Sequence, residues 1–118
     1  MALDLVAISA RRLTYNSEDH DAVSRAWWAV LGQISPNAAA VILPNDLTIA
    51  NRLLDRIRPA AIILTGGDDL GSDPTRDAVE LGLAKSALAN SIPIVGICRG
   101  FHLLNRMFGG HVARADAA

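Results

Sequence analysis

One cysteine stands in a context that suits a catalytic nucleophile. Cys98 is the only cysteine of the chain, and it lies between Gly96 and Gly100, directly after an apolar run and before a helical pattern. A strand that turns sharply into a helix needs glycine beside the turning residue, because little room is left there. The start of a helix also favours thiolate over thiol. The pattern predicts a nucleophile elbow; the alternative is a buried structural cysteine at a strand end.

A glycine pair ends the apolar run that precedes the cysteine motif. Gly66 and Gly67 follow this run directly, and we expect them at the carboxyl edge of a parallel sheet, where open α/β sheets carry their sites. Glycine lets backbone N–H groups point into a crevice, as an oxyanion hole requires. We predict the N–H groups of Gly67 and Arg99 as the donors. The alternative for the glycines is a plain tight turn, and Asp68 and Asp69 fit a solvated loop.

Three histidines could supply a general base, namely His20, His102 and His111. Only His102 is near Cys98 by its spacing, since four residues along a helix return to roughly the same face. It is a weak candidate base, and a packed or solvated histidine is the alternative. A metal set of Cys98, His102 and His111 does not have the spacing of common zinc modules, so we expect neither a metal nor a cofactor.

Four short apolar runs must position these residues. They cover residues 3–9, 39–43, 60–64 and 92–97, and segments of helical periodicity separate them. This alternation predicts a mostly parallel sheet with the order βαβαβαβα in a single domain over residues 1–118. The first helix is expected to start near Ser17, with one buried face. That face would comprise Val23, Trp27, Val30, Leu31 and Ile34.

Capping signals mark the other helices. Asp46 is expected to cap a second helix that ends before Pro59. Asp73 followed by Pro74 predicts the start of a third helix that runs to Asn90. Residues 98–109 are expected to form a fourth helix, and residues 111–118 form a polar tail without a strand.

Composition excludes several classes of function. Of the 118 residues, 51% are apolar and 19% charged, and the formal net charge is −1. This balance gives no basic footprint for nucleic acid or for an anionic membrane. No apolar run reaches the roughly 20 residues of a membrane helix, so we expect a soluble, cytoplasmic protein.

Several segments together carry a family resemblance. They are Leu64-Thr-Gly-Gly-Asp, Asp73-Pro-Thr-Arg-Asp with Glu80, Gly96-Ile-Cys-Arg-Gly, and Leu103-Leu-Asn with Gly109-Gly110. With them the chain resembles the class I glutamine amidotransferase-like superfamily, and its γ-glutamyl hydrolase branch in particular. The resemblance implies a doubly wound, flavodoxin-like fold. It also implies that Cys98 attacks a γ-glutamyl amide or peptide, while the loop of Gly66 and Gly67 and the backbone of Arg99 bind the substrate and its oxyanion.

The chain also departs from this family. The family's general base is a histidine held by a Glu or Asp, and both follow well beyond the cysteine motif, where this chain has no residues. We therefore expect the N-terminal portion of the domain, with His and Glu/Asp supplied by a partner chain, or a tendency to self-associate. His102 replaces a glutamine that many members carry in the substrate pocket.

Two functions remain open at this point. The first is a cysteine-dependent hydrolase or amidotransferase that acts on glutamine or on a γ-glutamyl amine or peptide. The second is an inactive, truncated family member that serves as an interaction module or a remnant. A nucleotide-binding role of the same fold is disfavoured, because neither G-x-G-x-x-G nor a Walker A segment occurs.

Overall fold

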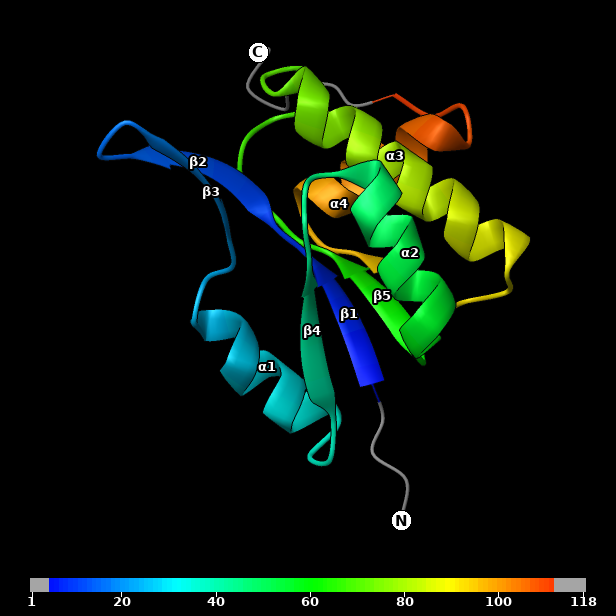
Figure 1. Cartoon of the computed structure of the whole chain (residues 1–118). Helices are drawn as coiled ribbons and strands as arrows, with labels where there is room; N and C mark the ends of the chain where they lie inside the picture. The colour runs from blue at the N-terminus through cyan, green and yellow to red at the C-terminus, as the bar shows by residue number, and fades with distance from the viewer. Residues whose placement is uncertain (1–4, 112–118) are drawn as a thin grey trace, which may run out of the picture.

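A parallel sheet of four strands forms the centre of the computed structural model, which describes residues 5–111 (Figure 1). Its strands are β4 (Ala39–Leu43), β1 (Leu5–Ser9), β5 (Ala61–Leu64) and β6 (Ile94–Gly96), in that spatial order. The helices are α1 (Ala26–Ile34), α2 (Leu47–Ile57), α3 (Pro74–Ala89) and α4 (Arg99–Met107). Strands and helices alternate as expected, and the α/β doubly wound, parallel arrangement is confirmed. Residues 3 and 4 of the expected first strand, and the tail beyond His111, lie outside the described residues.

The register of the sheet brings the carboxyl ends of its strands to one edge. Ser9 pairs with Leu43, Ile8 pairs with Ile63, and Ile63 pairs with Val95. The loops that follow β5 and β6 therefore leave the sheet side by side, which positions the candidate site.

Helices cover the two faces of the sheet unequally (Figure 1). On one face, α2, α3 and α4 pack on a large core that includes Ile62, Leu64 and Leu83. On the other face, the buried Leu31 of α1 belongs to a smaller core with inward residues of β1 and with Ile63 of β5. Val95 of β6 shares that face with Ile63 but is 49% exposed, so α1 leaves the edge strand uncovered.

Side-chain caps start two helices as the sequence predicts. The carboxylate of Asp46 accepts a hydrogen bond from the N–H of Ile49 at 3.0 Å. The carboxylate of Asp73 accepts one from the N–H of Arg76 at 3.1 Å, and Pro74 is the first helical residue. Both caps satisfy N–H groups that lack an intrahelical acceptor.

The expected start of the first helix near Ser17 is wrong. An antiparallel hairpin of β2 (Arg11–Tyr15) and β3 (Glu18–Ala22) occupies this region and projects from the sheet (Figure 1). Asn16 and Ser17 form its two-residue turn, with φ values of 51° and 63°, the conformation that suits the twist of a hairpin. Residues 18–22 are too polar to give a helix a buried face, whereas strand pairing satisfies their backbone.

The helix that follows begins at Ala26, and its expected buried face is only partly buried. Leu31 is buried and Trp27 is partly buried, but Val30 is 40% and Ile34 72% exposed. Leu88 near the end of α3 is exposed as well. Val30 and Ile34 of α1 are exposed because this helix lies at one side of a four-stranded sheet and faces it with little more than Leu31 and Trp27.

Candidate functional site

Two loops meet at the carboxyl edge of the sheet. One follows β5 and contains Thr65, Gly66 and Gly67, and the other joins β6 to α4 and contains Cys98. The Ile97 N–H donates to the carbonyl oxygen of Leu64 at 3.0 Å, which ties the loops together. A Cβ atom placed on Gly66 would lie 3.4 Å from the Cβ of Cys98, so these two residues are in contact distance.

Cys98 adopts an uncommon backbone conformation. Its φ is 52° and its ψ −111°, and its side chain is exposed. A positive φ at a residue with a side chain is unusual and is held only where the surroundings determine it. Cys98 directly precedes the first residue of α4, so it stands at the end of the helix where N–H groups lack intrahelical acceptors. Arg99 is that first residue.

Gly96 and Gly100 allow the close approach that this turn requires. A Cβ on Gly96 would lie 2.5 Å from the carbonyl of Gly100, and a Cβ on Gly100 would lie 2.3 Å from the carbonyl oxygen of Leu64. Since the obstructing atoms are backbone, no side chain can be accommodated at either position without moving the strand or the helix.

Three hydrogen bonds between Ser9 and Thr65 fix the loop after β5 to the centre of the sheet. The N–H of Thr65 donates to the Ser9 hydroxyl at 2.9 Å, the Thr65 hydroxyl donates to the Ser9 carbonyl at 3.0 Å, and the two hydroxyls lie 3.2 Å apart. Both side chains are buried. The following Gly67 has a φ of 128°, which strongly favours glycine.

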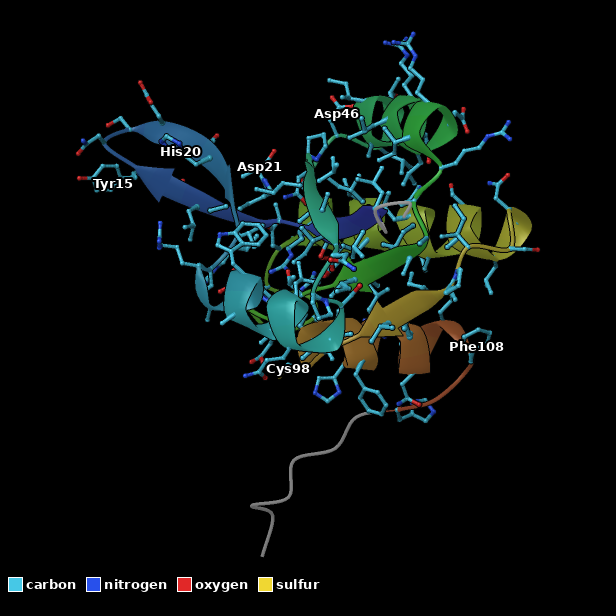
Figure 2. The ribbon with its side chains drawn as sticks, turned by 90° about the horizontal axis from the view of Figure 1, so that it is seen from below. Tyr15, His20, Asp21, Asp46, Cys98 and Phe108 are labelled. Atoms are coloured by element: carbon cyan, nitrogen blue, oxygen red, sulfur yellow. The ribbon has the colours of Figure 1, made fainter. Side chains whose placement is uncertain are left out.

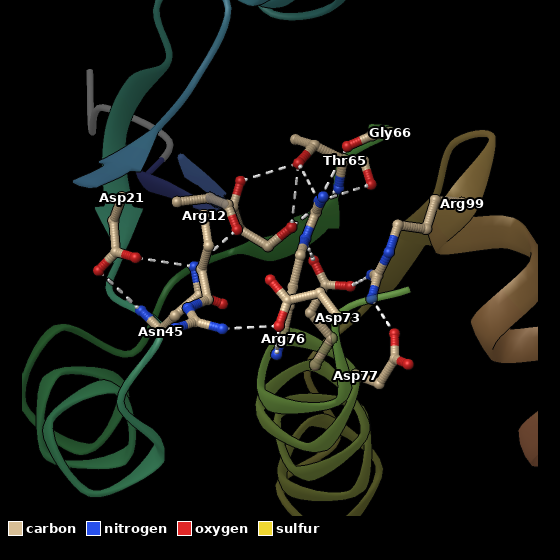
Figure 3. A network of polar contacts seen from close by, with 12 residues as sticks. Arg12, Asp21, Asn45, Thr65, Gly66, Asp73, Arg76, Asp77 and Arg99 are labelled. Carbon is tan, nitrogen blue, oxygen red and sulfur yellow. Dashed lines mark hydrogen bonds and ion pairs between the residues drawn. The ribbon is translucent and has the colours of Figure 1, made fainter. Parts of the chain in front are cut away.

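The buried guanidinium of Arg76 lies directly under this loop. Its Nη2 donates to the carbonyl oxygen of Gly66 at 2.9 Å and to the carbonyl and hydroxyl of Thr65 at 3.2 and 3.1 Å (Figure 3). Its Nε pairs with Glu80 one turn along α3 at 3.2 Å. Burial lowers the pKa of Arg76, while the carboxylate of Glu80 opposes this effect.

Arg99 connects the same helix to the cysteine loop. Its side chain is buried and forms ion pairs with Glu80 and Asp77 of α3 (Figure 3). The sequence pattern did not predict this network. The four-residue spacing of Arg76 and Glu80 is the one signal of it in the sequence.

Another ion pair anchors the start of α3. Arg12 of the hairpin contacts the carboxylate of Asp73 at 2.7 Å. Burial acts to raise the pKa of Asp73, but the hydrogen bond from the Arg76 N–H and the guanidinium of Arg12 outweigh it and lower that pKa below its ordinary value. Asp68, by contrast, is exposed and pairs with Arg11 at 3.4 Å.

The three histidines occupy different places. His20 lies on the projecting hairpin beside Tyr15, away from Cys98 (Figure 2). His111 is exposed, and its carbonyl accepts a hydrogen bond from Asn105 at 3.2 Å. His102 lies one turn after Cys98, with its N–H bonded to the Cys98 carbonyl at 3.0 Å. The buried Nδ1 of His102 has no hydrogen-bond partner within residues 5–111.

Other kinds of site find little support in the same part of the chain. Among the described residues, no three His, Cys, Asp or Glu side chains are grouped to hold a metal ion. None of the helices there has the length and apolar character needed to cross a membrane. A cavity of about 830 Å³ is lined by residues such as Asn51, Arg58 and Pro93. It lies at the amino edge of β5 and β6, opposite Cys98, and is not part of this site.

Known proteins resemble this chain along most of its length. A family model described as Peptidase C26 matches residues 4–115. The chain is 40% identical to the glutamine amidotransferase-like protein YvdE of Lactococcus lactis subsp. lactis, over 61% of this chain and 36% of YvdE. It is 36% identical to a subunit of the glutamine-hydrolyzing GMP synthase of Methanococcus maripaludis strain C6, over 66% of this chain and 37% of that relative.

A further relative is the glutamine amidotransferase-like protein RP404 of Rickettsia prowazekii, which is 34% identical over 65% of this chain and 32% of its own length. The chain thus spans about a third of the length of the curated relatives it matches.

Proposed function

This chain belongs to the peptidase C26 family, whose model matches residues 4–115, and we propose that it takes part in cysteine-dependent cleavage of a γ-glutamyl C–N bond with Cys98 as the nucleophile. The substrate would be glutamine or a γ-glutamyl amine or peptide. Relatives named glutamine amidotransferase-like or glutamine-hydrolyzing support this substrate class.

One observation carries the proposal, namely the position of Cys98 against the loop after β5. Cys98 is exposed and has a positive φ, and its Cβ lies 3.4 Å from the position that a Cβ on Gly66 would take. This arrangement supports the nucleophile elbow that the sequence predicts. It also supports an oxyanion hole, because Gly67 follows Gly66 in the loop after β5 and Arg99 directly follows Cys98.

The reaction would proceed through an acyl-enzyme. The thiolate of Cys98 attacks the γ-carbonyl carbon, a C–S bond forms, and the negative charge develops on the carbonyl oxygen between the N–H groups of Gly67 and Arg99. Collapse of this intermediate breaks the C–N bond, and ammonia or an amine leaves with a proton from a general acid. Water then attacks the thioester, glutamate is released, and Cys98 recovers its thiol.

We consider two candidates for the general acid and base. A second polypeptide could supply the histidine and its carboxylate, and such a partner is supported by the name of the methanococcal relative, which describes one subunit of a synthase. His102 is the internal candidate, because it lies one turn from Cys98 and its Nδ1 lacks a partner among the described residues.

Labelling with electrophiles tests the nucleophile directly. The probe is the diazoketone analogue of L-glutamine, its mirror-image D isomer is the stereochemical control, and iodoacetamide reports general thiol reactivity. We expect one equivalent of the L-diazoketone on wild type, slowed by added L-glutamine, and none on Cys98→Ala, which removes the only thiol. Equal labelling by both isomers, without protection by glutamine, would reject a γ-glutamyl pocket.

Turnover is the second test. Release of ammonia from glutamine is measured in a single turnover, for wild type, Cys98→Ala and His102→Ala. Loss of the burst in Cys98→Ala alone points to an external base, whereas loss in both variants points to His102. Identical rates in all three proteins would contradict the proposal.

A second candidate function is an inactive interaction module. The observation in its favour is the uncovered edge strand β6, in which Val95 is 49% exposed, together with Ile97 just after the strand, which is 40% exposed. Open strand edges and apolar patches favour association. Sedimentation velocity of wild type and Val95→Lys tests it: association that the lysine abolishes supports this function, and a wild-type monomer at every concentration contradicts it.

A further inference from the structure

A buried carboxylate connects the two loops of the proposed site. Both oxygens of Glu80 are used, since Oε1 pairs with Nε of Arg76 at 3.2 Å and Oε2 pairs with Nη1 of Arg99. The side chains of Glu80 and Arg76 have no exposed surface, and that of Arg99 has almost none. A carboxylate in such a place is held only by its partners, because burial of an unpaired charge is costly.

Each arginine holds one of the two loops. Arg76 donates from Nη2 to the carbonyl oxygens of Thr65 and Gly66, which fixes the peptide planes that precede Gly67. Arg99 is the first residue of α4 and directly follows Cys98, so it adjoins the other loop. Its side chain turns back to Glu80 and Asp77 and so restrains the first turn of α4 (Figure 3).

The close packing at Gly67 makes the position of this loop sensitive to small displacements of the Arg76 guanidinium. A Cβ placed on Gly67 would lie 2.7 Å from Nη1 of Arg76, so the guanidinium fills the space directly beneath this residue. Nη1 has no hydrogen-bond partner among the described residues. The Arg76 guanidinium is thus held by Glu80 on one side and the loop carbonyls on the other, and its displacement would release the loop.

We propose that Glu80 is a positioning residue that sets the distance between the N–H groups of Gly67 and Arg99 through Arg76 and Arg99. This inference rests on the proposed function for its chemical meaning, because these N–H groups are the donors of the proposed oxyanion hole. Glu80 touches neither substrate nor sulfur; it acts through the two arginines.

Neutralising the carboxylate while keeping its shape is the sharpest perturbation. Glu80→Gln retains the size of the side chain, but it replaces one of the two carboxylate oxygens, which accept hydrogen bonds, by an NH₂ group, which donates them. One of the two arginines would then face an N–H group instead of an oxygen. The two guanidinium charges would also lose the carboxylate that lies between them.

Ser86→Ala serves as the matched control on the same helix. Ser86 hydrogen-bonds Asn51 of α2 at 2.9 Å, far along α3 from the site, so its loss weakens the packing of α3 without touching either loop. A residue that only stabilises α3 would behave like Ser86. Asp77→Asn is a milder variant at the site, since Asp77 pairs with Arg99 and accepts from the N–H of Gly71 at 2.8 Å.

Two readouts separate positioning from plain stability. The first is the rate of Cys98 labelling by the L-glutamine diazoketone divided by the rate with iodoacetamide, measured where circular dichroism shows each variant folded. We expect this ratio to fall at least about tenfold in Glu80→Gln, since a displacement near 1 Å costs up to about 100-fold. Ser86→Ala should keep the wild-type ratio.

The second readout is the set of backbone amide signals in ¹H–¹⁵N NMR spectra. In Glu80→Gln the signals of Gly66, Gly67 and Arg99 should move together, although these residues lie on two loops. An unchanged labelling ratio, or movement of α3 signals alone, would overturn the proposal. If Glu80→Gln does not fold, Asp77→Asn decides: joint movement of Arg99 and Gly66 supports coupling, and movement of Arg99 alone overturns it.

These readouts also keep the two proposals apart. If the diazoketone does not label the wild type, but the three amide signals move together in Glu80→Gln, the proposed function is rejected and the positioning role is retained. If the diazoketone labels the wild type, but Glu80→Gln changes neither the labelling ratio nor the amide signals, the proposed function is retained and the positioning role is rejected.

Discussion

Replacement of Gly100 by alanine is expected to destabilise the protein through a backbone collision. The new Cβ would lie 2.3 Å from the carbonyl oxygen of Leu64 and 2.7 Å from its Cβ, whereas ordinary contacts begin at 3.4 Å. Strand β5 or helix α4 must therefore move by about 1 Å. Overpacking of this kind costs up to about 3 kcal/mol, and the upper value applies because backbone atoms cannot rotate away.

Two other glycines provide controls of the same chemistry. Gly32 lies in α1, and its Cβ would meet nothing within 4 Å. Alanine there should stabilise the protein by about 1 kcal/mol through helix propensity. Gly82 of α3 is intermediate, because its Cβ would meet the side chain of Leu47 at 2.5 Å, and a leucine side chain can adjust. The difference between Gly100→Ala and Gly32→Ala should isolate a steric cost of about 3 kcal/mol.

The assay is urea denaturation of the three variants, followed by circular dichroism. The free energy of unfolding should rank Gly32→Ala above wild type, and Gly82→Ala above Gly100→Ala. The Gly100 variant should also lose selective labelling of Cys98, because the bond from the Ile97 N–H to the Leu64 carbonyl aligns the two loops. A Gly100→Ala protein as stable as Gly32→Ala would refute the close approach of β5 and α4.

Three further outcomes are expected. Asp73→Asn should lower the free energy of unfolding by about 1 kcal/mol at pH 7. Because the pKa of Asp73 is lowered in the folded protein, this difference should persist above the unfolded pKa of about 3.9 and vanish as the pH falls through the folded pKa. Denaturation at pH 6 and at pH 2.5 checks this. Asp46→Ala should cost about 1 kcal/mol by the same assay, whereas Asp46→Asn should cost much less, since asparagine also caps helices. Thr65→Val should cost about 1–3 kcal/mol, because the buried hydroxyl of Ser9 and the guanidinium of Arg76 lose a partner; a change below about 0.5 kcal/mol would show that these bonds are not formed.

Local patterns in the sequence predicted most elements of this fold. The strand at residues 39–43 was placed at its observed bounds, and Asp46 and Asp73 were identified as caps. These features depend on neighbouring residues alone, since a cap needs only a carboxylate and the N–H groups of the next turn. The motif around Cys98 is also a local feature, because the spacing of its glycines indicates where a strand turns sharply into a helix. The catalytic roles of Cys98, Gly67 and Arg99 remain predictions.

The hairpin was missed although its turn has a local signal. Asn16 is a residue that tolerates a positive φ, and polar strands flank it. The regular spacing of Val23, Trp27 and Leu31 was extended backwards over residues that have no apolar face. Contacts distant in sequence decided the outcome, as when Asn45 donates to the carboxylate of Asp21 at 3.0 and 3.1 Å.

The sequence by itself therefore determined the alternation of strands and helices, the caps and the place of the cysteine, because each follows from interactions within a few residues. Only the tertiary structure decided that Glu80 joins Arg76 to Arg99, and that α1 leaves Val95 uncovered. The physical reason is distance along the chain. Arg99 lies 19 residues beyond Glu80, and their ion pair exists because the sheet brings the end of β6 beside α3.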